Sequence, residues 1–424
     1  MRGELPPAGA ARLGRRVLMF YPSLLFPPDT GSRRRGMFVL EYLLNRFGSV
    51  HLCMAQGAPT AGGTDQAGVA ELRSRGAVIH LVPLGGAAPA VVAGRLRRWA
   101  SLLFRGRMPS FEGSGYLDPA LNEGFRGVVA AVDPEVVLIT HTRYAGLAAS
   151  WPRGTFSVLD TIDVQKELDA CYAGYSGLKA LLKPVLQGYR ERGAAYRSEV
   201  RILAKYRRIL AISSGDRKAF LGAGLAEDSV FEVCEAFGET RSTPVALEGP
   251  KDIDLLVVAS RFLGTEESIR YLLEQVLPRC RRPLSLTVVG SICAYLASAP
   301  VRPPDQVRMV QAGVVPDLAP YYQRSRLVVI PVLRGTGVSI KCAEAFSRGA
   351  AVVTTAIGAR GTAAVDGENC LMAEGPESFA GKIEEALDDP ALRGRLGAAA
   401  LATSRRSRAL AYETLDRLFA PVLA

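Results

Sequence analysis

A glycine turn that leads into a helix is the stretch of this chain best suited to chemistry. The segment R-G-T-G-V-S-I-K-C-A-E-A-F-S-R-G covers residues 334–349. Gly335 and Gly337 stand on either side of Thr336, and small residues let the backbone approach a ligand closely. The N–H groups at the start of the helix predicted over Val338–Arg348 favour an anion. The pattern therefore predicts a phosphate-binding turn.

Polar residues of the same helix can extend that site. The backbone of Val338 and Ser339 opens the helix, and Lys341 follows in the first turn as a charge partner for phosphate. Glu344 lies about one turn further on, where a carboxylate can accept hydrogen bonds from ribose hydroxyls. The alternative is an ordinary βαβ unit with a solvated Lys–Glu–Arg face. The sequence lacks the strict G-x-G-x-x-G fingerprint, so the glycines alone do not decide between the two.

The elements that position this turn are two predicted strands. Leu327–Val332 is an apolar run rich in Val and Ile, and Ala351–Thr355 is a second apolar run. Gly349 stands where a left-handed helix C-cap is expected. The order strand, glycine loop, helix, strand is typical of a doubly wound parallel sheet.

Several ordered motifs around the turn resemble the donor-binding region of family-4 glycosyltransferases, the retaining enzymes of GT-B fold. The Gly-rich turn, the Lys and the Leu-Glu-Ala of that family correspond here to G-T-G-V-S-I-K-C-A-E-A at residues 335–345. The resemblance continues through A-I-G-A-R-G at 356–361 and V-D-G-E-N-C-L-M at 365–372, and backwards to V-V-G-S at 288–291. It is strong over roughly residues 255–386 and thinner before them.

The resemblance implies roles for residues in the second half of the chain. It implies that Arg261, in V-A-S-R-F, meets the donor diphosphate, for which a planar guanidinium is well suited. It also implies that the backbone around Gly313 and Val314 contacts the base and that Glu344 holds the ribose. The Lys that usually follows the Arg is missing here, so Lys341 is expected to supply that charge.

One departure from the family pattern concerns the transferred sugar. Many members carry a further Glu, which contacts that sugar, at the position of Thr336. Other branches replace it with a Gly-Ser/Thr-Gly turn, so transfer is compatible with this sequence, although the donor sugar is left open. The chain therefore allows an alternative: a GT-B protein that binds a nucleotide sugar, or serves as a scaffold, and has lost transfer.

The first half of the chain is expected to hold the acceptor. A strand over Arg16–Tyr21, a proline-rich loop and a helix over Gly36–Arg46 begin another parallel sheet. The resemblance places Gly31 of this loop at the interdomain cleft. The three arginines at 33–35 can hold phosphate or an acidic acceptor there, and a solvated charge cluster is the alternative.

Two further candidates follow predicted strands of the first half. His141 comes directly after the strand Pro134–Thr140, where the family often has a His that faces the sugar; the alternative is a structural His. Asp163 follows the strand Thr155–Leu159, and helix capping is its alternative role. The strand Arg208–Ser213 is expected to be the last of this half.

The predicted fold class is α/β: a GT-B fold of two doubly wound, Rossmann-like domains that face each other across a cleft. Residues 1–245 form the predicted acceptor domain. Residues 246–404 form the predicted donor domain, with strands near 255, 284, 307, 327, 351 and 371. Residues 405–424 are a predicted C-terminal helix that, by the resemblance, returns to the N-terminal domain. A length of 424 residues fits more than one domain of about 150 residues.

Composition and charge exclude several other classes of protein. No apolar run approaches the ~20 residues that span a bilayer. Seven scattered Cys without a C-x-x-C pair, and three His, predict reduced thiols, a cytoplasmic location and no metal site. The net charge of +11 allows an anionic partner, but the sequence has no recognisable nucleic-acid module, so nucleic acid is not expected. A basic amphipathic helix around Trp99 is predicted to dock on its own domain, with peripheral membrane contact as the alternative.

Together these features predict a retaining glycosyltransferase that uses a nucleotide-diphosphate sugar as donor. The acceptor (a glycan, a lipid-linked molecule or a small natural product) and the oligomeric state are left open. By the resemblance, the donor phosphate accepts the acceptor's proton on the same face of the sugar, which gives retention without a bound metal or other cofactor. The protein then contributes positioning and charge stabilisation.

Overall fold

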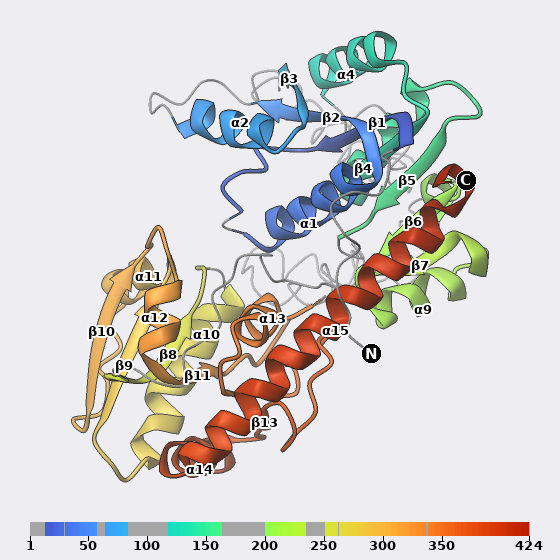
Figure 1. Cartoon of the computed structure of the whole chain (residues 1–424). Helices are drawn as coiled ribbons and strands as arrows, with labels where there is room; N and C mark the ends of the chain where they lie inside the picture. The colour runs from blue at the N-terminus through green and yellow to red at the C-terminus, as the bar shows by residue number, and fades with distance from the viewer. Residues whose placement is uncertain are drawn as a thin grey trace, which may run out of the picture. The chain divides into compact units, whose positions relative to one another are not determined.

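The computed structural model describes residues 13–28, 30–56, 64–83, 118–162, 200–234, 251–261, 263–335 and 338–423. These residues form two compact units (Figure 1). The N-terminal unit comprises the described residues up to Val233 and those from Tyr412 onward, and the C-terminal unit runs from Cys234 to Ala411. The predicted domain boundary at residue 245 and the predicted helix around Trp99 lie outside the described residues.

The N-terminal unit is built on a seven-stranded parallel sheet in the order β3-β2-β1-β4-β5-β6-β7. The chain proceeds outward from β1 to β3 and then returns to the other side of β1, so the topological switch point lies between β1 and β4. The expectation that the strand at 208–213 ends this half was wrong, because β7 follows it and pairs with it. The strands are β1 (Leu13–Tyr21), β2 (Phe47–Gln56), β3 (Val78–Pro83), β4 (Val136–Thr140), β5 (Phe156–Asp160), β6 (Arg208–Ala211) and β7 (Val230–Glu232).

Helices cover both faces of this sheet. They are α1 (Gly31–Arg46), α2 (Thr64–Ser74), α4 (Pro119–Val132), η1 (Thr142–Ser150), α9 (Ser214–Gly222) and η2 (Glu227–Ser229). The first of them begins at Gly31 and not at the predicted Gly36. The reason is that the Thr30 side chain accepts a hydrogen bond from the Arg33 N–H and so caps the helix.

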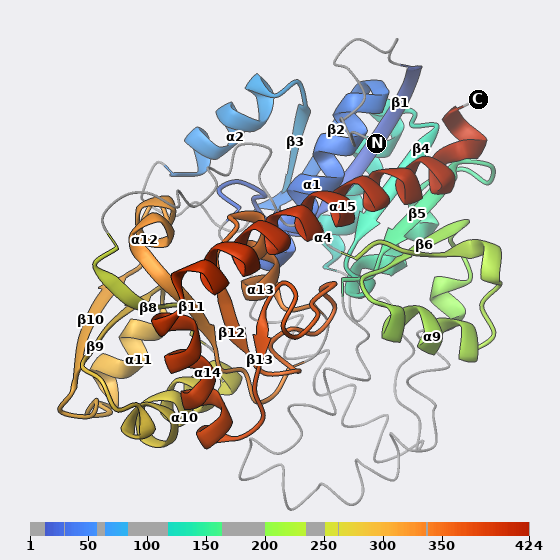
Figure 2. The same ribbon diagram turned by 60° about the horizontal axis from the view of Figure 1, so that its bottom comes forward.

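The two faces of the N-terminal sheet have separate cores. On one face, α4, η1 and α9 bury alternate strand residues such as Phe20 and Leu159 together with Phe125. The other face is covered by α1 and by the end of the C-terminal helix α15 (Pro390–Leu423), where the Tyr42 and Phe419 rings stack 5.6 Å apart. Figure 2 shows this end of α15 running along the N-terminal unit.

The C-terminal unit repeats the doubly wound plan with a six-stranded sheet in the order β10-β9-β8-β11-β12-β13. All its pairs are parallel, and its switch point lies between β8 and β11. Every strand predicted for this half is present, which confirms the α/β class. The strands are β8 (Ile253–Val258), β9 (Leu284–Val289), β10 (Val307–Gly313), β11 (Ser325–Ile330), β12 (Val352–Thr354) and β13 (Leu371–Met372).

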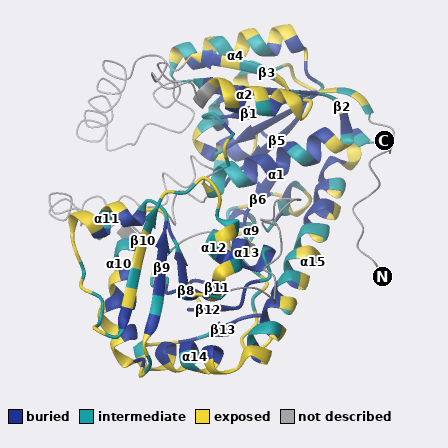
Figure 3. Cartoon of the chain, turned by 60° about the vertical axis from the view of Figure 1, so that its left-hand side comes forward, coloured by how far each residue is buried: buried dark blue, intermediate teal, exposed yellow. Residues whose placement is uncertain are grey.

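Helices also cover both faces of the C-terminal sheet. They are α10 (Leu263–Tyr271), η3 (Leu272–Val276), η4 (Leu277–Arg279), α11 (Ile292–Ser298), α12 (Ala319–Arg324), α13 (Ile340–Ser347) and α14 (Pro376–Asp388). In Figure 3 the inner strands are buried, whereas the edge strand β10 carries exposed residues. The C-terminal helix was predicted to begin at residue 405, but α15 begins at Pro390 and supplies its first part to this unit.

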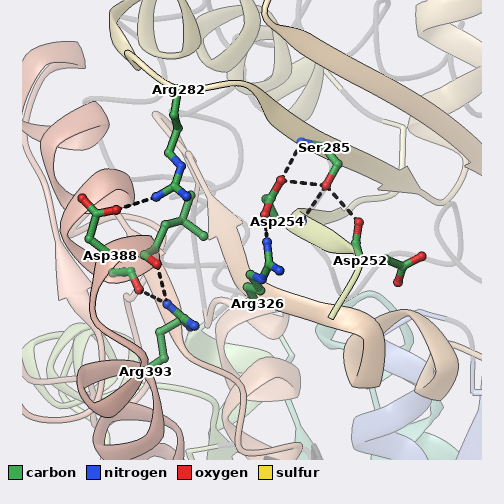
Figure 4. Close-up of polar contacts among 9 residues, drawn as sticks. Asp252, Asp254, Arg282, Ser285, Arg326, Asp388 and Arg393 are labelled. Carbon is green, nitrogen blue, oxygen red and sulfur yellow. Dashed lines mark hydrogen bonds and ion pairs between the residues drawn. The ribbon is translucent and has the colours of Figure 1, made fainter. Parts of the chain in front are cut away.

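A polar network closes the amino ends of the central strands of this unit (Figure 4). One oxygen of the Asp254 carboxylate accepts hydrogen bonds from the Ser285 N–H (2.8 Å) and hydroxyl (2.9 Å), and the other pairs with Arg326. Arg282 pairs with Asp388, and Arg393 donates to two carbonyls at the end of α14. This edge of the sheet is therefore occupied by its own side chains.

Candidate functional site

The predicted donor residues gather at the opposite, carboxyl edge of the C-terminal sheet. Arg261 follows β8, Gly313 ends β10, and Gly335 follows β11. Because β8 and β11 flank the switch point, the predicted phosphate residues come from the two loops between which a doubly wound sheet binds its ligand. A 3.3 Å ion pair between Arg334 and Glu267 joins the loop after β11 to α10, the helix that follows β8.

Backbone contacts hold the strand ends of this edge together. The Gly290 N–H donates to the Gly313 carbonyl at 2.6 Å, and the Ile292 N–H donates to the Ala259 carbonyl at 3.3 Å. Gly290 has φ +112°, and a Cβ there would lie 2.2 Å from the Ala259 oxygen. Only glycine permits this close crossing of the loops after β8 and β9.

Arg261 lies on the surface of this edge with its guanidinium already directed by neighbours. Its Nε donates to Glu266 at 2.9 Å, and its side chain lies over the Tyr295 ring, 5.9 Å from the centroid. Its backbone N–H donates to the Ser291 hydroxyl at 2.8 Å. The side chain is half exposed, so it can reach an anionic ligand, although Glu266 competes for it.

The described part of the glycine turn is tied to the loop after β12. The Arg360 guanidinium donates to the Gly335 carbonyl at 3.0 Å, and the Ser339 N–H donates to the Arg360 carbonyl at 2.8 Å. Gly361 has φ +71°, and a Cβ there would lie 2.7 Å from the Val338 side chain. The A-I-G-A-R-G motif therefore holds both ends of the turn through the hydrogen bonds of Arg360. Thr336 and Gly337 lie outside the described residues.

The helix α13 begins at this turn. Among the described residues, the Ser339 side chain caps none of the first N–H groups of the helix, which leaves that end suited to an anion. Lys341 lies in the first turn, and burial lowers the pKa of its ammonium group. A bound phosphate would act in the opposite sense, because a nearby negative charge stabilises the ammonium.

Glu344 is buried, with 6% of its surface exposed. Arg348 forms an ion pair with it at 3.4 Å and lies over the Tyr322 ring, 4.8 Å from the centroid. The alternative of a solvated Lys–Glu–Arg face is therefore wrong for Glu344. A carboxylate held in place in this way can accept hydrogen bonds from a ligand at low cost in conformational entropy.

Gly313 and Val314 close the edge on the β10 side. Gly313 has φ +71° and turns the chain away from the sheet. Val314 is 78% exposed, so its side chain is accessible to the flat face of a base.

The candidates of the N-terminal unit lie at its own switch point. Gly31 begins α1 after the loop that follows β1, and His141 directly follows β4. His141 has φ +68° and ψ +125°, a strained backbone conformation of the kind that collects at functional sites. Burial lowers the pKa of its imidazole to about 4. Asp163 lies outside the described residues.

The three neighbouring arginines of α1 do not form one solvated or phosphate-binding cluster. Arg35 is fully buried and pairs with Asp160 at 2.7 Å. Arg34 Nε donates to the Pro28 carbonyl at 3.1 Å. Sequence reasoning missed the buried pair, although a signal was present: Asp160 closes a mainly apolar strand and so requires a partner.

Solved structures similar to this chain share its whole architecture. HepE of Anabaena in complex with UDP and glucose is 12% identical, covers 96% of this chain and 99% of its own, and gives a TM-score of 0.60. Sucrose-phosphate synthase of Thermosynechococcus elongatus is 16% identical over 96% of this chain and 100% of its own, with a TM-score of 0.62. A TarM variant of S. aureus in complex with fondaparinux, alpha-GlcNAc-glycerol and UDP is 11% identical over 96% and 99%, with a TM-score of 0.62. These likenesses show the GT-B fold.

A family model decides the class. Residues 254–389, from β8 to the end of α14, match the family described as Glycosyl transferases group 1. The protein is a glycosyltransferase with a group 1 domain and the GT-B fold. The match covers the whole carboxyl edge on which this glycosyltransferase gathers Arg261, Lys341 and Glu344. A comparison with curated protein sequences finds no match.

Metal-binding clusters and membrane-spanning helices are both absent from the described ranges of the glycosyltransferase. Within them, no group of three or more His, Cys, Asp or Glu could hold a metal ion. In the same part of the chain, no helix has both the length and the apolar character needed to cross a bilayer. Cys53, Cys342 and Cys370 are buried free thiols, as their apolar surroundings in the sequence predict.

Proposed function

We propose that this glycosyltransferase is a retaining enzyme that binds a nucleotide-diphosphate sugar at the carboxyl edge of its C-terminal sheet. One observation carries the proposal: Arg261 and Gly335 follow the two strands that flank the switch point, and α13 begins shortly after Gly335. That is where open α/β sheets bind nucleotides. The group 1 family match over the same residues supports it.

The diphosphate is proposed to lie against the start of α13. The first N–H groups of α13, which the Ser339 side chain does not cap, and the helix dipole attract it, and Lys341 supplies a full positive charge. Arg261 is proposed to bind from the opposite loop, exchanging part of its contact with Glu266 for the more strongly charged phosphate. These donors then stabilise the charge that develops on the leaving diphosphate.

The nucleoside is proposed to lie between α13 and the end of β10. Glu344 accepts hydrogen bonds from the ribose hydroxyls, with Arg348 holding the carboxylate in place. The backbone at Gly313 and the exposed Val314 side chain contact the base. A uridine nucleotide is the first choice, since the solved HepE and TarM structures of this fold hold UDP.

The N-terminal unit is proposed to bind the acceptor and to contribute His141 to the transferred sugar, with Gly31 beside it and Asp163 as a further candidate. The donor phosphate accepts the acceptor's proton on the face from which it leaves, so the anomeric configuration is retained. We propose further that transfer needs no metal, that the protein works in the cytoplasm, and that the basic segment around Trp99 can touch a membrane surface.

Product analysis tests this proposal. The protein is mixed with UDP-, GDP- and ADP-sugars and with glycan, lipid-linked and small-molecule acceptors, with and without EDTA. We expect a product whose mass has grown by one sugar, with the anomeric configuration of the donor by NMR and with yield unchanged by EDTA. Glu344→Gln is the matched inactive control. An inverted product would overturn the retaining assignment.

A binding protein without transfer is the second candidate, and two observations favour it. Thr336 replaces the Glu that many relatives direct at the sugar, and Glu266 already engages Arg261. This candidate predicts a rise in melting temperature with UDP-sugars but no product with any acceptor and no slow release of UDP.

A further inference from the structure

The largest fully buried side chain among the described residues is a charged one, Arg35 of α1. Its Nε donates to both oxygens of Asp160 at 2.8 and 2.9 Å, and its Nη2 lies 2.7 Å from the first of them. Nη1 donates to the Val233 carbonyl at 2.9 Å. Neither member of the pair is exposed. Burying two charges rarely adds stability compared with an apolar pair, so a structural role alone explains it poorly.

The partner of Arg35 also carries the backbone of His141. Asp160 is the last residue of β5, and its carbonyl accepts the His141 N–H at 2.8 Å. One residue further on, the Thr142 hydroxyl donates to the Thr161 carbonyl at 3.3 Å. These bonds hold His141 in its strained conformation at φ +68°. Any movement of Asp160 is thus transmitted to His141.

Charged groups surround the imidazole of His141. The carboxylate of Asp160 favours its protonation, whereas Arg35 and Arg143 oppose it. The Tyr21 ring packs against it with centroids 6.0 Å apart, and the Tyr21 hydroxyl donates to the Ser32 hydroxyl at 3.0 Å. Burial is the largest influence and lowers the pKa of His141 to about 4.

The protonation state of His141 matters for the proposed reaction. Positive charge develops at the reacting carbon of a sugar when its bond to the leaving group stretches. A neutral imidazole can donate a hydrogen bond to that sugar, while an imidazolium would repel the developing charge. An unpaired Asp160 carboxylate would attract a proton onto the imidazole, whose protonation this carboxylate already favours.

We infer that Arg35 is a positioning residue for transfer: by engaging both oxygens of Asp160, it fixes His141 and keeps its imidazole neutral. The inference rests on the proposed function, in which His141 meets the sugar. The charges of Arg35 and Asp160 cancel, so the carboxylate does not draw a proton onto His141. In the proposed reaction the sugar therefore meets a neutral imidazole instead of an imidazolium cation.

Two variants that break the same pair in opposite senses test the inference. Arg35→Met leaves a buried carboxylate, and Asp160→Asn leaves a buried guanidinium. The double variant Arg35→Met/Asp160→Asn has no buried charge and is the matched control; it also keeps the test open if a single variant fails to fold. The chain contains only three His, so each ring gives a separate NMR signal, and His51 and His80 are internal references.

We expect the pKa of His141 to rise by about 1–3 units in Arg35→Met, to stay low in Asp160→Asn and to stay low in the double variant. The pH profile of kcat should follow: in Arg35→Met activity falls on acidification through pH 6, and KM for the donor is unchanged. An equal change in the pKa of His141 in both single variants would overturn the inference, since a purely structural role of the pair predicts equal effects. The NMR titration needs no turnover, so failure of the proposed function would leave it interpretable.

Discussion

The carboxyl edges of the two sheets have the same topology but differ in how deeply their charged side chains are buried. At the C-terminal edge, glycines bring loops close together, Lys341 and Arg261 carry positive charge, and the first N–H groups of α13 receive no cap from Ser339. At the N-terminal edge, the corresponding arginine is buried and neutralised by Asp160, and the side chain that follows β4 is a neutral His141. We propose that the C-terminal edge binds an anion and that His141 at the N-terminal edge meets an uncharged group.

The difference suggests how two sheets of the same topology can take different roles in the proposed group transfer. The doubly wound sheet fixes where ligands bind, because loops from the two strands at the switch point diverge there. Which ligand binds depends on whether the cations of that edge are left for it or paired inside the protein. Substitutions at one edge at a time can test the two parts of this comparison separately.

The largest effect is expected from Lys341 at the C-terminal edge. Lys341→Ala removes the charge that is proposed to face the developing phosphate charge, so kcat/KM should fall by about 10²–10³-fold. Donor turnover measured with UDP-sugars checks this. Lys382→Ala is the matched control, because Lys382 lies on α14 and pairs only locally with Glu385. Equal losses in both variants would show that net charge, and not the site, matters.

Replacing either of two glycines by alanine is expected to have a smaller effect. Each substitution should affect only the edge at which its glycine lies. Gly290→Ala forces a Cβ within 2.2 Å of a backbone oxygen, and Gly36→Ala places one 2.6 Å from Leu25 and 2.7 Å from the Tyr21 ring. Each should cost about 2–3 kcal/mol of stability. Only Gly290→Ala should weaken UDP binding in calorimetry, whereas only Gly36→Ala should shift the His141 NMR signal.

The glycine prediction has its own controls. Gly381 and Gly127 lie in helices of the two units, and a Cβ on either meets nothing within 4 Å. Alanine at these positions should be neutral or stabilising by up to about 1 kcal/mol. Loss of UDP affinity in Gly36→Ala would contradict the separation of the two edges.

The smallest effect is a difference in acid sensitivity. All three His lie in the N-terminal unit, and burial lowers the pKa of each below 6.5. The unfolded chain therefore binds more protons as pH falls from 6.5 towards 4, and this unit loses at most about 1.4 kcal/mol per pH unit for each His. Both Trp also belong to the first 233 residues, so denaturation followed by Trp fluorescence reports that unit.

The C-terminal unit should lose stability at a lower pH than the N-terminal unit. Burial raises the pKa of the Asp254 carboxyl, but the hydrogen bonds from Ser285 and Arg326 outweigh it and lower that pKa below 3.8. The stability from this network is complete above pH 3.8 and is lost as pH falls through the depressed value.

In the N-terminal unit, His141→Asn is the matched variant, since Asn tolerates positive φ. It should flatten the loss between pH 6.5 and 4; an unchanged slope would contradict the assignment to His141.

Much of this arrangement could be predicted from local sequence, and the remainder depends on long-range contacts. The apolar runs of the C-terminal half predict every strand of its sheet, and the G-T-G-V-S-I-K motif predicts the turn before α13. The start of α1 was missed because the capping by Thr30 is a local signal that the adjacent prolines obscure. The contacts of Arg35 with Asp160 and of Arg261 with Tyr295 could not be predicted, since these residues meet only through the fold.

Hydrogen–deuterium exchange with and without UDP tests the central assignment most directly. Binding to the folded state slows local opening at the residues that the ligand contacts. We expect UDP to slow amide exchange at residues 338–344 at the start of α13 and to leave residues 31–36 and 141–150 unchanged. Protection at the N-terminal edge without any at α13 would contradict the placement of the donor.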